Sequence, residues 1–253
     1  MIQRQRYFLE IAYKGTAYHG WQIQPNALSV QEVLEKALTT VFRQKIETVG
    51  CGRTDTGVHA SQFFVHFDCL EADANPDNVE PRYLTSLNAL LPYDIAVKRI
   101  IRVQDDAHAR FDATRRSYQY FIHHHKNPFK HNFSWLLKES LHIAEMNKAA
   151  SYLLDYTDFS CFSKSNTQVF TNNCKIEKAE WQRNEDGLIF VITADRFLRN
   201  MVRAIVGTLV EIGRDKVPAE AIHQIVQSKN RPNAGTSVPA CGLYLTNIQY
   251  PYI

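Results

Sequence analysis

Apolar and polar residues alternate along several stretches of this 253-residue chain, and elsewhere the apolar ones recur with a helical period. In residues 6–14 every second side chain is apolar or aromatic, which predicts a strand. Residues 30–42 carry an apolar stripe at helical spacing, and Ser29 and Glu32 have the spacing of a capping box at its start, so a helix is predicted there. The same criteria predict strands at about 46–52, 61–69 and 95–103, and a second helix at about 79–91.

The second half of the chain repeats this organisation loosely. Strands are predicted at about 116–124, 174–182, 187–194 and 242–249, a hairpin turn at 184–187, and helices at about 144–154, 197–213 and 218–228. The order of the first half, β-α-β-β-α-β, is that of a ferredoxin-like unit. We therefore expect an α+β protein with two similar lobes, residues 1–106 and 107–253, that share a mixed, mainly antiparallel sheet.

Composition is that of a globular protein, with 45% hydrophobic and 22% charged residues. No stretch approaches the ~18 apolar residues of a membrane span, and the first residues lack the apolar core of a secretion signal. A cytoplasmic location without membrane attachment is therefore expected. The five cysteines include no C-x-x-C pair, so neither a disulfide framework nor a zinc site is predicted.

The net charge of +3 is unevenly distributed. Residues 98–131 contain eight Lys or Arg against three Asp, and residues 196–231 contain seven against three acids. Such segregation is typical of a protein with one anionic partner, although chance clustering on a solvated face gives the same pattern.

The most informative segment is residues 52–59, GRTDTGVH, which lies between two predicted strands. Its glycines predict a tight loop. Asp55, close to Arg53, is expected to stay ionised and could act as a nucleophile or a base. The alternative is an ordinary turn, because Asp and Gly are the usual turn residues.

Other candidates lie in the second half, and each has a structural and a functional interpretation. Arg203 lies at the edge of the apolar stripe of its predicted helix. Its side chain either extends to solvent or turns inward to pair with a carboxylate, and Asp55 is then the obvious partner. Tyr118 shares one face of its strand with Tyr120, which indicates either packing or a platform for a nucleobase. In the second interpretation, the adjacent Arg115 and Arg116 hold phosphates.

Several chemistries lack support. Only His123 and His125 of the 123–125 run share a strand face, and no Cys or acid completes a ligand set, so no metal is predicted. The G-x-S-x-G, P-loop and dinucleotide motifs are absent. A hydrolase that uses Asp55 with His59 remains possible but has no identifiable nucleophilic Ser.

Together these segments resemble the tRNA pseudouridine synthase A (TruA) family almost end to end. The motifs that carry the resemblance are YKG at 13–15, GWQ at 20–22, SVQE at 29–32, GRTD and GVH within 52–59, NALLP at 88–92, HARF at 108–111, FLRNMVR at 197–203 with Gly207, and GLYL at 242–245. The resemblance implies the pseudouridine synthase fold, with two RRM-like lobes and a central catalytic cleft. It also implies isomerisation of uridine to pseudouridine at positions 38, 39 and 40 of the tRNA anticodon stem-loop.

The resemblance further implies roles for individual residues. Asp55 would be the essential carboxylate, and Arg203 would keep it ionised. Tyr118 would stack on the flipped uracil, Arg53 would fill the space that the base leaves, and Leu245 would pack against the base.

The family needs no metal or organic cofactor and acts as a homodimer with tRNA reaching across both subunits. Two departures are Thr56, where the family usually has Ala, and Lys175, where Arg is commoner. A non-catalytic tRNA-binding protein with the same fold is the alternative that the resemblance leaves open.

Overall fold

The chain folds into two compact units in the computed structural model, which describes residues 4–70, 76–164 and 170–253. Unit 1 consists of Met1–Thr114 and Leu245–Ile253, and unit 2 of Arg115–Tyr244. The boundary expected at residue 106 lies within unit 1, and the last nine residues also belong to that unit, whereas we expected them in the second lobe.

Unit 1 follows the predicted β-α-β-β-α-β order. Its elements are β1 (Arg4–Tyr13), the 3-10 turn η1 (Gly15–Ala17), α1 (Val30–Phe42), β2 (Thr48–Gly50), β3 (His59–Leu70), α2 (Pro76–Leu90), β4 (Ile95–Arg102) and most of β9 (Leu243–Gln249). The strand order is β4-β1-β3-β9, with β2 beside β3. Strand β1 pairs antiparallel with both β3 and β4. The ferredoxin-like prediction for this half is confirmed.

The core of unit 1 lies on both faces of its sheet. On one face the predicted stripe of α1 is buried, and the Ser29 hydroxyl accepts a hydrogen bond from the backbone N–H of Glu32 at 3.2 Å, as the capping box predicts. On strand β1, four consecutive residues from Phe8 are buried, so both faces of the strand are covered. Tyr250 packs edge-on against the rings of Phe8 and Phe64, with ring centroids 5.3 and 5.2 Å apart.

His66, on β3, is expected to make unit 1 sensitive to acid. Its ring is buried, and its Nδ1 accepts a hydrogen bond from the backbone N–H of Ala109 at 3.0 Å. Burial, together with the positive charge of Arg6, lowers the pKa of His66 to about 4. Since the unfolded chain binds this proton near pH 6.5, the stabilisation is complete above that pH and is lost as the pH falls towards 4. The loss is at most about 3 kcal/mol.

Urea unfolding of the wild-type protein and of His66→Gln at several pH values between about 4 and 7 measures this effect. The variant keeps an acceptor for Ala109 but cannot be protonated, so its free energy of unfolding should fall less steeply with acid. Identical pH dependence in the two proteins would show that His66 has no part in it.

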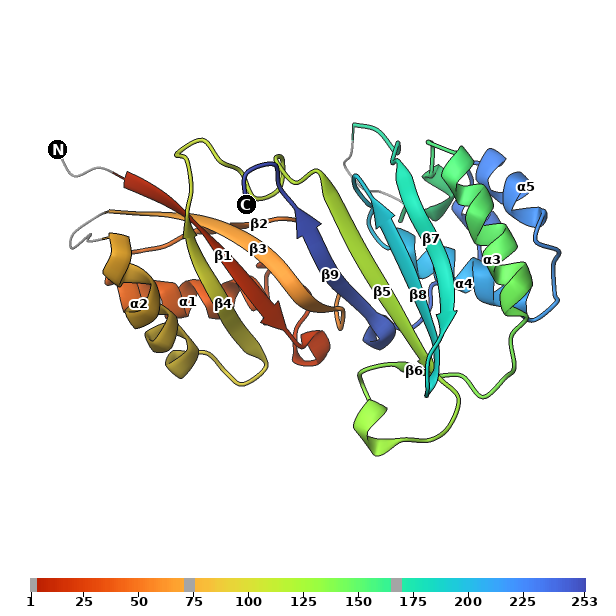
Figure 1. The fold of residues 1–253 in the computed structure, drawn as a ribbon, viewed down its shortest axis with the longest axis horizontal. Helices are drawn as coiled ribbons and strands as arrows, with labels where there is room; N and C mark the ends of the chain where they lie inside the picture. Colours follow the sequence, from red (N-terminus) through yellow and green to blue (C-terminus); the bar gives the residue numbers. More distant parts are fainter. Residues whose placement is uncertain (1–3, 71–75, 165–169) are drawn as a thin grey trace. The chain divides into compact units, whose positions relative to one another are not determined.

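Unit 2 carries the remaining elements. They are β5 (Arg115–His123), β6 (Trp135–Leu136), α3 (Ile143–Tyr152), β7 (Ile176–Arg183), β8 (Gly187–Ala194), α4 (Met201–Gly213), α5 (Ala221–Gln227), and short 3-10 turns that include Arg231–Asn233 and Ala240–Gly242. The strands lie in the order β5-β8-β7 with antiparallel pairing, and β6 adds a parallel pair to β5. Helices α3, α4 and α5 lie together beside β7 and β8 (Figure 1). The predicted α+β class, with a mixed and mainly antiparallel arrangement of strands, is confirmed.

Two local details of unit 2 differ from the sequence-based prediction. Helix α4 begins at Met201 rather than near residue 197, because Asn200 takes a left-handed conformation with φ 66° that ends the preceding loop. The two-residue strand β6 was not predicted, since it is too short to show a period. The hairpin between β7 and β8 is confirmed, and the Asn184 side chain accepts a hydrogen bond from the backbone N–H of Gly187 at 2.7 Å.

The histidine run at the end of β5 holds the segment that follows it. Nδ1 of His123 lies 2.6 Å from the hydroxyl of Ser134, and Nδ1 of His124 lies 2.8 Å from the carbonyl oxygen of Leu137. These contacts tie β5 to β6. Over residues 4–70, 76–164 and 170–253, no three His, Cys, Asp or Glu side chains gather in the manner of metal ligands.

Within the same described ranges, no helix combines the length and the apolar character needed to cross a membrane.

Candidate active site

Asp55 lies in unit 1, in the loop that joins β2 to β3, and the chain segment after β1 supports this loop through backbone hydrogen bonds. The carbonyl of Thr54 accepts from the N–H of Trp21 at 3.4 Å, and the N–H of Gly57 donates to the carbonyl of Tyr18 at 3.3 Å. Within the loop, the N–H of Val58 donates to the carbonyl of Asp55 at 3.1 Å, which closes a turn. The predicted tight loop is confirmed, and its backbone is fixed on both sides of Asp55.

Two glycines of the supporting segment allow this close approach. A Cβ atom on Gly15 would lie 2.0 Å from the carbonyl oxygen of Val58, and one on Gly20 would lie 2.4 Å from that of Thr54. Gly20 also has a φ of +92°, which L-residues with side chains rarely adopt. The YKG and GWQ motifs therefore pack against the GRTDTGVH loop and shape the backbone that carries Asp55. Sequence reasoning used these glycines only for the resemblance and missed this role.

The three polar side chains of the loop differ in exposure. Arg53 is exposed, Asp55 is half-buried, and His59 is buried at 1% exposure. Nδ1 of His59 accepts a hydrogen bond from the backbone N–H of Gly15 at 3.0 Å, so this ring contributes to the packing of the loop. A buried ring whose Nδ1 lone pair is engaged in this way is poorly placed to serve a hydrolase as its general base. Thr56, the departure from the family pattern, is exposed, so its extra atoms meet no packing constraint.

Leu245, the candidate contact of the base, lies on β9 in unit 1. Its side chain is 2% exposed, and its carbonyl accepts a hydrogen bond from the Ser61 hydroxyl at 3.5 Å. This bond ties β9 to β3 only a few residues from the Asp55 loop in sequence. Leu245 is therefore held rigidly by the sheet.

Tyr118 and Tyr120 lie on β5 in unit 2 and have different environments. Tyr120 is fully buried, and its hydroxyl donates to the carbonyl of Pro239 at 2.8 Å. Burial raises the pKa of Tyr120, so it remains a protonated donor, and the packing interpretation holds for this residue. Tyr118 is half-buried, and its ring meets the Phe197 ring edge-on at a centroid distance of 5.1 Å. Phe197, from the FLRNMVR motif, thus fixes the orientation of the Tyr118 ring.

Arg115 and Arg116, at the start of β5, contact residues at the start of β7 and just after β8. Nε of Arg115 forms an ion pair with Glu177 at 2.7 Å, and a terminal nitrogen of Arg116 donates to the carbonyl of Asp195 at 2.8 Å. Each guanidinium therefore has a structural contact in addition to any role towards phosphate. Sequence spacing gave no indication of the Glu177 pair, because that residue is remote along the chain.

Arg203 lies in the first turn of α4 and is half-buried. Its Nε donates to the carbonyl of Val238 at 2.8 Å, and its own carbonyl accepts from the N–H of Val238 at 3.3 Å. Arg203 thus does not simply extend to solvent, since the bond from its Nε holds the guanidinium group against Val238, whose own N–H is bonded to the backbone of Arg203.

Comparisons with known proteins point to one family. The family model described as tRNA pseudouridine synthase matches residues 11–112 and 149–251. A protein of Bacteroides fragilis named tRNA pseudouridine synthase A is 51% identical over 98% of this chain and 97% of its own length. Proteins with the same name from Bacteroides thetaiotaomicron and Bacillus subtilis are 50% and 39% identical, over 98% and 95% of this chain and 91% and 97% of their own lengths.

Proposed function

Because this chain belongs to the tRNA pseudouridine synthase A family, an isomerase family that acts on tRNA, we propose that it converts uridine to pseudouridine at positions 38, 39 and 40 of the anticodon stem-loop. The observation that carries the proposal is the match to the named relatives over 98% of this chain, and the family model covers the segments that contain Asp55 and Arg203. The loop geometry around Asp55 supports it further, because a carboxylate on a fixed backbone suits a reaction that needs accurate placement.

The reaction explains the residue types. The bond between C1′ of the ribose and N1 of the base breaks, the uracil rotates, and a bond between C1′ and C5 forms. C5 then loses its proton, and N1 gains one, so substrate and product are isomers. A charged carboxylate can attack the nucleotide or assist the first cleavage, and water must be excluded while the base is detached.

Each candidate residue has a proposed role in this reaction. Asp55 is the essential carboxylate, and Arg203 is the cation that pairs with it and aims it. Tyr118 stacks on the flipped uracil, while Arg53 fills the space that the base leaves in the stem-loop.

Three further residues complete the proposed set. Leu245 packs against the uracil, and Arg115 and Arg116 bind backbone phosphates.

The test is to incubate the protein with an unmodified tRNA transcript and to map carbodiimide-labelled pseudouridine by primer extension. Stops that map pseudouridine to positions 38, 39 and 40 are expected. Release of free uracil would instead indicate a hydrolase, and binding without modification of any of several tRNAs would indicate a non-catalytic RNA-binding protein. Stops that map pseudouridine to other positions would support the isomerase activity but contradict the assigned positions.

We also propose that the protein acts as a homodimer in the cytoplasm, with one tRNA contacting both subunits. The support is the family membership together with the anionic, cytoplasmic nature of the substrate. Analytical ultracentrifugation with and without tRNA tests the assembly. A monomer in both conditions would contradict the dimer.

A further inference from the structure

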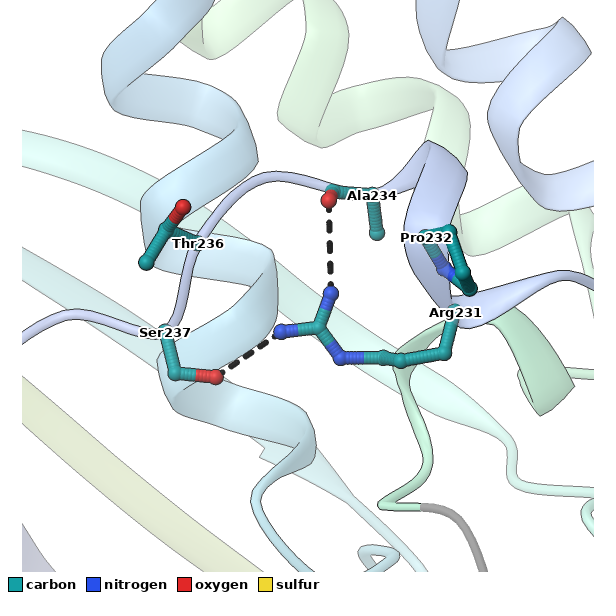
Figure 2. A pocket seen from close by; sticks show the side chains of 5 residues that line it. All are labelled: Arg231, Pro232, Ala234, Thr236 and Ser237. Carbon is teal, nitrogen blue, oxygen red and sulfur yellow. Dashed lines mark hydrogen bonds between the residues drawn. The ribbon is translucent and has the colours of Figure 1, made fainter.

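The loop at residues 231–238, which leads from α5 towards β9, lies directly on helix α4 (Figure 2). A Cβ atom on Gly207 of the helix would lie 1.9 Å from the carbonyl oxygen of Thr236, and one on Gly235 would lie 2.6 Å from the backbone nitrogen of Thr208. The hydroxyl of Thr208 accepts from the N–H of Gly235 at 2.8 Å. Loop and helix thus meet backbone to backbone, so a change in the loop is transmitted to the helix.

The guanidinium group of Arg231 holds this loop in its conformation. One terminal nitrogen donates to the carbonyls of Ala234 and Gly235 at 3.3 and 3.0 Å, and the other donates to the hydroxyl of Ser237 at 2.9 Å. Figure 2 shows the side chain turned back across the turn that it closes. The planar guanidinium group of Arg has donors in fixed directions and can reach acceptors on two sides, whereas the single ammonium group of Lys cannot hold both.

Two hydrogen-bonded links lead from this loop to the start of α4. Ser237 also accepts from the side-chain amide of Asn200, the residue that precedes the helix, at 2.5 Å. Its neighbour Val238 accepts from Nε of Arg203 and donates to the carbonyl of the same residue. The loop that Arg231 fixes therefore contains the carbonyl that orients the Arg203 guanidinium.

We propose that Arg231 is a positioning residue for the isomerisation. It acts through the loop at residues 231–238. This loop fixes the Val238 carbonyl and thereby the direction of the Arg203 side chain. Arg231 does not contact the substrate in this role, because its terminal nitrogens are committed to the three acceptors of the loop. The inference rests on the role proposed above for Arg203.

The test compares Arg231→Met, Arg231→Lys and Arg214→Met in the full-length protein, with release of tritium from C5-labelled tRNA as the assay. Arg231→Met should lower kcat by about 10- to 100-fold, since a misplaced catalytic group has effects of this size, while KM changes little. Arg231→Lys should recover only part of the loss. Arg214 lies at the other end of α4 and binds Glu139 and Glu211, so its variant should lower the thermal midpoint but not kcat.

A double-mutant cycle separates this role from a general loss of stability. In an Arg203→Lys background, Arg231→Met should lower kcat by less than about twofold, because the group through which it acts is already altered. An equal fold-loss in both backgrounds, or an unchanged kcat in Arg231→Met, would overturn the inference. If Arg203→Lys itself has full activity, the direction of the guanidinium group does not matter and this inference fails, although the charge role of Arg203 stands because Lys keeps the positive charge.

The Arg203 Nε–H resonance gives a readout that does not depend on activity. In the wild-type protein, the hydrogen bond to Val238 should slow exchange of this proton with water. In Arg231→Met, the exchange should be faster at a temperature where the variant is folded. Unchanged exchange would contradict a positioning role even if kcat falls.

Discussion

Asp55→Asn is expected to lower the rate of pseudouridine formation about a thousandfold or more. The amide has nearly the same size as the carboxylate, and the turn that fixes residue 55 is closed through its backbone carbonyl, so the loop should keep its conformation. What disappears is the negative charge and the nucleophilic oxygen. Tritium release from C5-labelled tRNA measures the rate, and filter binding measures whether the affinity for tRNA is retained.

Asp105→Asn is the matched control. This residue is an exposed carboxylate of unit 1, so the same chemical change is made outside the candidate site. Its rate should equal that of the wild-type protein. The proposed role of Asp55 would be refuted if Asp55→Asn retained a rate comparable to that of the control.

Gly20→Ala is expected to reduce both stability and activity. The left-handed φ of +92° costs an L-residue about 1–2 kcal/mol, and the new Cβ would lie 2.4 Å from the carbonyl oxygen of Thr54, which must shift. The total loss in free energy of unfolding should be about 2–4 kcal/mol. Because Thr54 precedes Asp55, we also expect a lower rate at temperatures where the variant remains folded. Urea unfolding and the tritium assay measure the two effects.

Gly52→Ala serves as the control within the same loop. A Cβ atom on Gly52 meets no atom within 4 Å, so the free energy of unfolding should change little. Equal stabilities of the two glycine variants would show that the contact between residues 20 and 54 does not constrain the loop.

The parts of the fold that depend on local signals could be predicted from the sequence. The capping box of α1, the hairpin before β8 and the glycine-bracketed loop around Asp55 all involve residues that are close along the chain. For such residues, the spacing along the chain is set directly by the local backbone geometry, so the motif predicts that geometry. The candidate residues were found in the same way, since their motifs are short and contiguous.

The support of those residues could not be predicted, because it is non-local. The bond from Gly15 to His59 joins residues 44 positions apart, and that from Arg203 to Val238 joins residues 35 positions apart. Backbone contacts of this kind leave no period in the sequence. The late start of α4 has the same origin, since the loop that contains Ser237 holds Asn200 in place before the helix begins.

The discontinuity of unit 1 has a consequence for how the protein is made. Tyr250 covers Phe8 and Phe64, and its hydroxyl donates to the carbonyl of Ala109 at 2.5 Å, so residues 245–253 complete the core of unit 1. These residues leave the ribosome only after all of unit 2. At about 5–20 residues per second, the earlier strands of unit 1 wait on the order of ten seconds with this apolar face uncovered. During synthesis, the nascent chain therefore exposes the apolar face around Phe8 and Phe64 until residues 245–253 are available to cover it.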